Sequence, residues 1–478
     1  MPKYPSAIDV KLPVLPGFYP DPSVVLVGDR YYLANSTFEY GPGVPIHSSS
    51  DLINWTFESH ALQTKAHSDL TGLTDSMGIF APTLRFHDGK FYMITTLTDG
   101  KWQVLVTATN PAGPWSEPVR IDAPGIDPDL AWDEIGNCCM SYASLALGGL
   151  AQVQINTETG DLVSEPKRIW QGMGGKFPEG PHLYKIGDWW YLLIAEGGTE
   201  RGHAVALARS KNINGPFEGD PSGVLLSNRG TDLPIQNTGH ADLVQRPDGT
   251  WAMVFHGTRP RGGSPEWHVM GRETCAVGID WEDGWPKLGT PIEPSAIAPV
   301  SESLDRNSEP PAQWITPGGW AHELIEKTPD GLMVNGYVGR RQTTPIFEVR
   351  AKLSGDDLHG LGVGIDSKHH FSLVRTGNKV AAMWAIGSRY FELESVDITG
   401  SSFEFCIKAE ETVAEGFHRG GPDNLVASLR YANGEVKELA RIDGKYISTE
   451  VAGGMTGRVI GIIAAGPTLL ESWSYEGQ

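Results

Sequence analysis

The first 290 or so residues repeat one pattern of apolar and polar positions five times. In each copy, a short apolar run is followed by a tight turn containing Asp or Gly and then by a second apolar or aromatic run. The first copy places Gly28-Asp29 between two such runs, and the second places Asp88-Gly89 in the same way. The remaining copies begin near residues 127, 179 and 240. This order of runs and turns predicts five β-hairpins.

Several repeats continue with a third alternating run and an aromatic turn, which leaves room for a short fourth strand. Four-stranded units arranged around an axis form a β-propeller, so the repeats predict a five-bladed propeller from about residue 12 to 295. The repeats lie roughly 45 to 60 residues apart, which is longer than a bare blade requires. We therefore expect insertions at residues 60–78 and 226–238, where they would help to build a binding face.

The pattern changes beyond residues 291–314, a segment rich in Pro, Ser and Glu that is typical of a linker. Alternating runs at residues 344–353 and 403–408, with Asn-Gly and Asp-Gly turns nearby, predict a second β unit of the sandwich type. The chain is therefore expected to be all-β. The expected domains are a propeller at 1–295, a linker at 296–313 and a jelly-roll, concanavalin-like β-sandwich at 314–478.

Composition narrows the range of partners. The formal net charge of −20 and the pI near 5.1 disfavour nucleic acid, anionic membrane surfaces and polyanionic substrates, and favour a neutral ligand. The N-terminal residues lack the pattern of a signal peptide, and no apolar run approaches the length of a membrane span, so we expect a cytoplasmic protein. The four cysteines lack the spacing of a disulfide framework or a zinc site and are expected to be buried thiols.

Three of the five repeats begin with a carboxylate, namely Asp21, Asp127 and Glu179. Equivalent positions of a closed propeller converge on its axis, so these side chains are expected to meet there. Glycosidic hydrolysis needs two carboxyl groups, one that protonates the leaving oxygen and one that activates water or attacks directly. Asp21 and Glu179 belong to repeats across the axis, which favours the wider separation of an inverting enzyme. Negative charge from Asp127 would keep Glu179 protonated.

Each acid also has a structural explanation. An isolated Asp-Pro is commonly only a turn, and Glu179 alone would fit an exposed surface position. Turn formation does not require acids at three related places around one axis. The shared place in the repeats therefore favours chemistry.

Five motifs extend the argument from single residues to a family. They are 17–23 (GFYPDPS), 36–39 (STFE), 125–128 (GIDP), 179–185 (EGPHLYK) and 271–274 (GRET). In sequence and in order, these motifs resemble glycoside hydrolase family 43, and within it the β-xylosidases. The resemblance spans the predicted propeller and extends more weakly to the C-terminal unit. It implies that Asp21 is the general base, that Asp127 orients and tunes the site, and that Glu179 is the general acid.

The resemblance also implies residues that bind the sugar. Arg272 matches a substrate-contacting Arg that would also hold nearby carboxylates ionised, and Phe38 matches an aromatic wall of the pocket. His240 matches a His near the axis that contacts sugar or helps to hold a divalent ion such as calcium, although no cofactor is expected to be required. The structural alternatives are an ion pair between Arg272 and Glu273, an ordinary buried Phe and a core His.

Two positions depart from the β-xylosidase pattern. Phe80 stands where a Trp is usual, and Ile126 stands where a Phe precedes the middle Asp. Both positions border the sugar pocket in the family. The three acids are retained, so the departures bear on the choice of sugar rather than on hydrolysis. Pocket shape separates xylose from arabinofuranose by small free energies.

The sequence thus predicts an inverting exo-glycosidase that releases a terminal pentose, foremost β-D-xylose, from short xylo-oligosaccharides. The first alternative is an α-L-arabinofuranosidase acting on arabinose-decorated oligosaccharides. The second is a non-catalytic sugar-binding propeller. The resemblance further implies a homo-oligomer.

Overall fold

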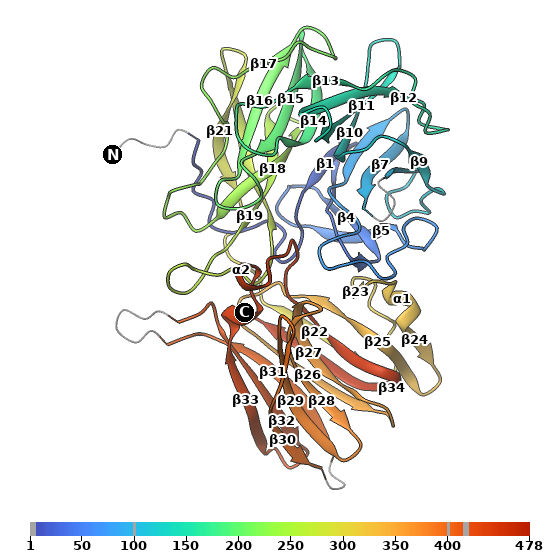
Figure 1. Ribbon diagram of the computed structural model, residues 1–478, viewed down its shortest axis with the longest axis vertical. Coiled ribbons are helices and arrows are strands. Elements are labelled where there is room, and N and C mark those ends of the chain that lie inside the picture. The colour runs from blue at the N-terminus through green and yellow to red at the C-terminus, as the bar shows by residue number, and fades with distance from the viewer. Residues whose placement is uncertain (1–5, 99–101, 399–401, 414–419) are drawn as a thin grey trace.

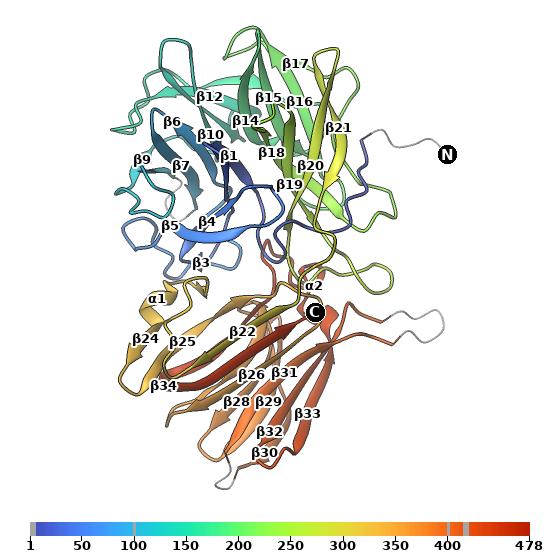
Figure 2. The ribbon, with the colours of Figure 1, turned by 180° about the vertical axis from the view of Figure 1, so that it is seen from behind.

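A computed structural model describes residues 6–98, 102–398, 402–413 and 420–478. Two bodies lie one above the other, the N-terminal one coloured blue to yellow-green and the C-terminal one orange to red (Figure 1). The same division is visible from behind (Figure 2). Both bodies consist almost entirely of β-strands, so the predicted all-β class is confirmed.

The N-terminal body contains five four-stranded antiparallel sheets. Their strands are, in chain order, β1 (Ser23–Val27), β2 (Arg30–Ala34), β4 (Gly43–Ser49) and β5 (Thr56–Leu62); β6 (Thr83–His87), β7 (Lys90–Leu97), β8 (Trp102–Ala108) and β9 (Val119–Ile121); β10 (Ile126–Trp132), β11 (Cys138–Ser144), β12 (Gly149–Ile155) and β13 (Lys167–Trp170); β14 (Glu179–Ile186), β15 (Trp189–Glu196), β16 (Ala204–Ser210) and β17 (Glu218–Gly219); β18 (Gln236–Gln245), β19 (Trp251–Thr258), β20 (Glu273–Glu282) and β21 (Trp285–Ile292).

Short turns and contacts between neighbouring sheets explain why these strands form a ring. Gly28-Asp29, Asp88-Gly89 and Gly187-Asp188 each join two paired strands through a two-residue turn, as the pattern predicts. The first strand of each sheet contacts its neighbours, and β1 contacts both β6 and β18, so the first and last sheets close the circle. The predicted five-bladed propeller is confirmed.

The C-terminal body is a two-layered sandwich. Its elements are β22 (Val300–Asp305), α1 (Ala321–Leu324), β24 (Ile325–Thr328), β25 (Gly331–Arg341), β26 (Phe347–Ser354), β27 (His359–Asp366), β28 (His369–Thr376), β29 (Lys379–Ile386), β30 (Arg389–Asp397), β31 (Phe403–Glu410), β32 (Asn424–Tyr431), β33 (Val436–Asp443), η1 (Gly444–Ile447), α2 (Thr449–Ala452) and β34 (Val459–Gly477). The long strand β34 belongs to both layers, because its first half pairs with β25 and β27 and its second half with β22 and β26.

Along β26, every second side chain is buried and the others are partly exposed. The buried side chains fill the space between the two layers. One apolar cluster runs through this interior and includes Trp314, Phe371, Phe405 and Trp473. The predicted sandwich is therefore confirmed. Strand β22 lies inside the segment 296–313 that the sequence assigns to a linker, and it pairs with β34 of the sandwich.

The two bodies are joined by a small sheet in which β3 (Tyr40–Gly41) of the propeller pairs with β23 (Thr316–Pro317). All four cysteines are buried and unpaired, as expected. Among the described residues, no helix combines the length and the apolar character needed to cross a membrane.

Candidate active site

The inner strands of four blades share an unusual backbone conformation beside the axis. Asp21, Asp127, Gly180 and His240 have φ angles of 52°, 56°, 55° and 45°. L side chains rarely adopt this left-handed region, and such residues cluster at functional sites. Strand register also shifts at the corresponding places in β10, β14 and β18. A bulge of this kind re-aims the side chains beside it.

In the fourth blade, the residue with the left-handed backbone is not the acid that the sequence repeat predicts. Gly180, rather than Glu179, occupies the left-handed position, and Glu179 lies one residue earlier. A Cβ atom at Gly180 would lie 2.9 Å from the ring of His240, so only glycine fits there. The Gly180 N–H donates a hydrogen bond of 3.1 Å to Oδ2 of Asp127. The three acids therefore converge, although their positions in the repeat are not strictly equivalent.

Asp21 is buried beside a fixed positive charge. Nη1 of Arg272 lies 2.7 Å from its Oδ1, and the Ser36 hydroxyl donates to its Oδ2. Burial is the largest single influence and would by itself raise the pKa of Asp21, but Arg272, followed by His240 and His256, together outweigh it, and the pKa lies well below its ordinary value. Asp21 is therefore a carboxylate at neutral pH, as a general base must be.

Asp127 and Glu179 show the opposite shift. Burial, followed by the neighbouring carboxyl groups of Glu179 and Asp21, raises the pKa of Asp127 well above its ordinary value. Burial, followed by the charge of Asp21, raises the pKa of Glu179 to about 7. Glu179 can therefore keep a proton near neutral pH, as a general acid must.

Two buried histidines connect the neighbourhoods of Asp21 and Glu179. Nδ1 of His256 lies 3.1 Å from the backbone nitrogen of Asp21 and 3.1 Å from its Oδ1. Nε2 of His256 lies 3.2 Å from Nδ1 of His203, and Nε2 of His203 lies 3.9 Å from Oε1 of Glu179. Burial lowers the pKa of both rings, to about 4 for His256, so both are neutral.

A cavity of about 670 Å³ opens over Glu179 and Arg272. Both bodies line it: the propeller contributes Phe177, Glu179, Gly198, Thr199, Glu200, Arg201, Gly202, Asn237, His268 and Arg272, and the sandwich contributes Thr449, Glu450, Gly453, Gly454, Met455 and Thr456. The sandwich residues belong to α2 and the loop after it, at the junction with the propeller (Figure 1). The Met455 carbonyl accepts a hydrogen bond of 3.5 Å from Arg272, which joins the sandwich to the acid site.

The predicted sugar-binding residues lie at different depths. The Arg272 guanidinium is 5.5 Å from the centre of the Phe38 ring, and the Phe80 ring is 5.5 Å from that of Phe38. Nδ1 of His240 is 3.6 Å from Oδ1 of Asp21. Ile126 packs against the apolar cluster between the third and fourth blades. Of these five residues, only Arg272 lines the cavity.

The family resemblance allows a calcium ion near His240. Among the described residues, no group of three or more His, Cys, Asp or Glu side chains is arranged to hold a metal ion. Calcium also prefers oxygen ligands, whereas imidazole rings surround this part of the axis. The ion stays a prediction.

Sequence reasoning missed four contributors to the site: Ser36, His203, His256 and Met455. Ser36 stands in the quoted motif 36–39, and a polar residue before the pocket aromatic was a usable signal. His203 and His256 lie in central strands or beside them, where a buried histidine has no local signature. Met455 reaches Arg272 across 183 positions of the chain, and no local pattern reports such a contact.

A propeller whose axis gathers an ionised carboxylate and a protonated carboxyl group under a cavity has the parts of a glycosidase. Comparison with known proteins agrees. Residues 10–286 match the model of the Glycosyl hydrolases family 43. The chain belongs to this family and is a glycoside hydrolase, as predicted, so the reading as a non-catalytic sugar-binding propeller is set aside.

Several relatives are similar over almost the whole chain. A non-reducing end alpha-L-arabinofuranosidase of Bacteroides ovatus is 34% identical, with 95% of this chain and 91% of the relative aligned. A xylosidase/arabinosidase of Butyrivibrio fibrisolvens is 31% identical, with 95% of each covered. The crystal structure of a xylan beta-1,4-xylosidase from Bacillus halodurans superposes with a TM-score of 0.87 at 30% identity, covering 98% of this chain and all of that one.

Proposed function

We propose that this enzyme is an inverting exo-glycosidase that releases terminal pentose, foremost β-D-xylose, from short xylo-oligosaccharides. The observation that carries the proposal is the different surroundings of two carboxyl groups in one site. Asp21 contacts the Arg272 guanidinium at 2.7 Å and its pKa is lowered, whereas burial and the charge of Asp21 raise the pKa of Glu179 to about 7. An inverting glycosidase requires this division between base and acid.

The proposed reaction is a single displacement. The Asp21 carboxylate removes a proton from a water molecule as the water oxygen bonds to the anomeric carbon. The bond between that carbon and the leaving oxygen breaks, and Glu179 delivers its proton to the leaving oxygen. The released sugar has inverted configuration, Asp21 carries the proton from water, and Glu179 is ionised. Proton exchange with solvent then restores both groups.

Arg272 and Asp127 support this step without exchanging protons with the substrate. Arg272 holds the Asp21 carboxylate in place through Nη1 and Nη2, at 2.7 and 3.4 Å. Asp127 orients the start of the fourth blade through the Gly180 N–H. Burial and the neighbouring carboxyl groups raise its pKa, which disfavours a further negative charge beside Glu179, and the charge that raises the pKa of Glu179 is that of Asp21 rather than the expected Asp127.

Cleavage at chain ends is supported by the shape of the site. The sandwich loop that carries Met455 stands over the propeller mouth and helps to line the cavity. A long polysaccharide would have to pass this loop in order to be cut internally, whereas a chain end can enter the cavity directly. A relative named for non-reducing-end action, 34% identical, also supports exo cleavage.

An α-L-arabinofuranosidase is the second candidate. The same relative, aligned over 95% of this chain, is named for that activity. The changes at Phe80 and Ile126 also lie in the part of the chain where the family resemblance places the sugar pocket. The xylosidase-named structure at 30% identity favours the first candidate.

The test is a panel of aryl β-D-xyloside, α-L-arabinofuranoside and β-D-galactoside substrates with purified enzyme. We expect the highest kcat/KM on the xyloside, and a higher value on the arabinofuranoside would establish the second candidate. ¹H NMR of the first product should show α-xylose before mutarotation. Early β-xylose would contradict inversion, and mixed oligomers from long xylan would contradict exo cleavage.

The proposal includes a cytoplasmic location and a homo-oligomeric state. Both come from the sequence alone. Fractionation of the native organism's cells and light scattering coupled to gel filtration would test them.

A further inference from the structure

A second cavity, of about 290 Å³, lies where the propeller meets the sandwich. Its lining residues are Glu39, Tyr40, Asp75, Pro317, Tyr337, Gly362, Val363, Gly364, Asp366, Ser367, His370, Ser372 and Ile463. None of them lines the cavity over Glu179. The family resemblance and the proposed function assign no role to this place.

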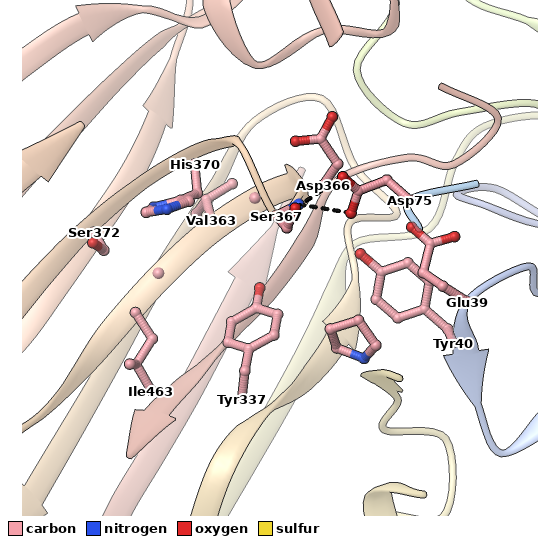
Figure 3. A pocket seen from close by; sticks show the side chains of 13 residues that line it. Glu39, Tyr40, Asp75, Tyr337, Val363, Asp366, Ser367, His370, Ser372 and Ile463 are labelled. Atoms are coloured by element: carbon pink, nitrogen blue, oxygen red, sulfur yellow. Dashed lines mark hydrogen bonds between the residues drawn. The ribbon is translucent and has the colours of Figure 1, made fainter. Parts of the chain in front are cut away.

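The two sides of the cavity differ in chemistry. Figure 3 shows Glu39, Tyr40 and Asp75 gathered on one side, with Val363 and Ile463 on the other. The Tyr337 ring stands between them. The lining set contains three carboxyl groups and no Lys or Arg. The cavity is therefore amphipathic, with an acidic end and an apolar end.

Tyr40 presents an unpaired hydroxyl to this space, beside the buried carboxyl group of Glu39. Glu39 is 3% exposed, and its carboxyl group accepts hydrogen bonds from the Ser76 N–H, over 3.0 Å, and from its own backbone N–H. Tyr40 is 2% exposed, and its hydroxyl makes no hydrogen bond with another described residue. A buried hydroxyl normally has a partner, so one that faces a cavity beside a carboxyl group points to a ligand.

The other acids are already engaged. Both carboxylate oxygens of Asp75 accept hydrogen bonds from Ser367, at 3.1 and 2.8 Å. Asp366 contacts the ring of His369 at 2.9 Å. Burial, with the charges of Asp75 and Asp366, raises the pKa of Glu39 to about 8. Glu39 is thus a buried carboxyl group in a negative field, without a cation to neutralise it.

These features select the class of ligand. An anion would be repelled by the carboxyl groups. A bare metal ion lacks a ligand set, because no described cluster of three or more His, Cys, Asp or Glu residues is arranged to hold one. A neutral sugar would leave most of its hydroxyl groups against apolar wall. A cation with N–H donors and a short hydrocarbon body matches both ends.

We propose that this junction cavity binds a small primary ammonium ion. Its N–H groups donate to the Glu39 carboxylate and to the Tyr40 hydroxyl oxygen, and its hydrocarbon part packs against Tyr337, Val363 and Ile463. An ammonium group near an aromatic ring gains further attraction from the ring. Because both bodies line the cavity, the ligand bridges the propeller and the sandwich.

The first experiment is isothermal titration calorimetry of the full-length enzyme with n-butylammonium chloride, with 1-butanol as the neutral counterpart. We expect the ammonium ion to bind at least tenfold more tightly than the alcohol. Binding of the ammonium ion favours the ionised form of Glu39. Near pH 7, Glu39 should therefore release a proton on binding, and the apparent enthalpy of binding should depend on the ionisation enthalpy of the buffer. Affinity should increase from pH 6 to pH 8.5 as Glu39 ionises.

We assign this pH dependence to Glu39 rather than to the titratable groups that face it. They are Tyr40, Asp75, Tyr337, Asp366 and His370. Burial raises the pKa of both tyrosines above this range and lowers that of His370. Equal binding of alcohol and ammonium ion, or no proton release, would overturn the proposal.

Two variants locate the bound ion. Glu39→Gln retains an acceptor for the Ser76 N–H but removes the charge, and Ser372→Leu fills the apolar end. Each should weaken n-butylammonium binding at least tenfold, while exposed Glu323→Gln on α1 serves as the matched control and should bind as wild type does. Circular dichroism confirms that each variant is folded. Undiminished binding in folded Glu39→Gln, with competition by substrate, would place the amine in the active site and overturn the proposal.

Discussion

The propeller axis and the domain junction each bury a carboxyl group among other acids. At the axis, the Arg272 guanidinium lies 2.7 Å from Asp21, and the Asp21 pKa falls well below its ordinary value. At the junction, Glu39 faces Asp75 and Asp366 without a lysine or arginine in the cavity lining, and its pKa rises to about 8. Burial opposes ionisation at both places. At the axis, Arg272 together with His240 and His256 outweighs burial, whereas no lysine or arginine in the described lining of the junction cavity does so for Glu39.

The two regions are linked by short paths. Residues 36–39 serve both, because Ser36 donates to Asp21 while Glu39 faces the junction. The Ser76 N–H donates to Glu39, and the Ser76 hydroxyl accepts from the N–H of Met455. The Met455 carbonyl then accepts from Arg272. The following experiments alter the cation, the acids or this link.

The largest effect is expected for Glu179 and Asp21, the proposed catalytic acid and base. Glu179→Gln should lower kcat on xylobiose by about 10²- to 10⁴-fold, because the leaving oxygen loses its proton donor. A 2,4-dinitrophenyl xyloside has a leaving group that needs little protonation, so the same variant should lose far less activity on it. Initial rates on the two substrates measure the difference.

Asp21→Asn is the matched control for that assignment. Loss of the base impairs attack by water whatever the leaving group, so the activity should fall similarly on both substrates. If Asp21→Asn instead kept most of its activity on the dinitrophenyl substrate and Glu179→Gln did not, Asp21 would be the acid and Glu179 the base.

Without the positive charge of Arg272, the pKa of Asp21 at the axis should rise, as the pKa of Glu39 does at the junction. In Arg272→Met, Asp21 keeps its burial but loses its partner, so the acidic limb of the kcat/KM profile should move to higher pH by about one unit or more. Arg272→Lys retains a positive charge and should move less. An acidic limb that stays in place in Arg272→Met would show that the charge of Arg272 does not govern Asp21.

The junction acid should make stability depend on pH. The pKa of Glu39 is raised in the folded protein, so Glu39 binds a proton there that the unfolded chain releases, and stability falls as pH rises from about 4.5 to about 8. One pKa unit corresponds to about 1.4 kcal/mol, so the loss amounts to a few kcal/mol at most. Tm of Glu39→Gln should decrease less than that of wild type between pH 5 and pH 8. A parallel decrease in both would contradict the raised pKa.

The smallest effect is expected for the link between the regions. Ser76→Ala removes the acceptor for the Met455 N–H, and loss of one hydrogen bond of about 1 kcal/mol should raise KM roughly fivefold through the loop over the cavity. The matched control is Ser367→Ala at the same junction. The Ser367 hydroxyl donates a hydrogen bond to Asp75 and does not contact the Met455 loop, so the KM of this variant should stay near that of wild type. Equal KM values for the two variants would show that the hydrogen bond between Ser76 and Met455 does not affect substrate binding.

Local pattern was sufficient for the framework. The two-residue turn at Gly28-Asp29 and the alternating run of β26 were readable because strands and tight turns impose their requirements on adjacent residues. The repeated spacing then placed Asp21, Asp127 and Glu179 around one axis. The one-residue offset at Gly180 escaped this reasoning, since it follows from the space that the ring of His240 occupies.

The sequence by itself therefore determined the all-β class, the five blades and the sandwich, and it singled out three acids whose catalytic roles stay a prediction. Only the tertiary structure decided which carboxyl groups are ionised, which histidines stand behind them and how the sandwich helps to line the cavity. The reason is that charge state depends on atoms within a few ångströms, and folding brings those atoms from distant segments. Arg272 reaches Asp21 across 251 positions, and no local pattern encodes that meeting.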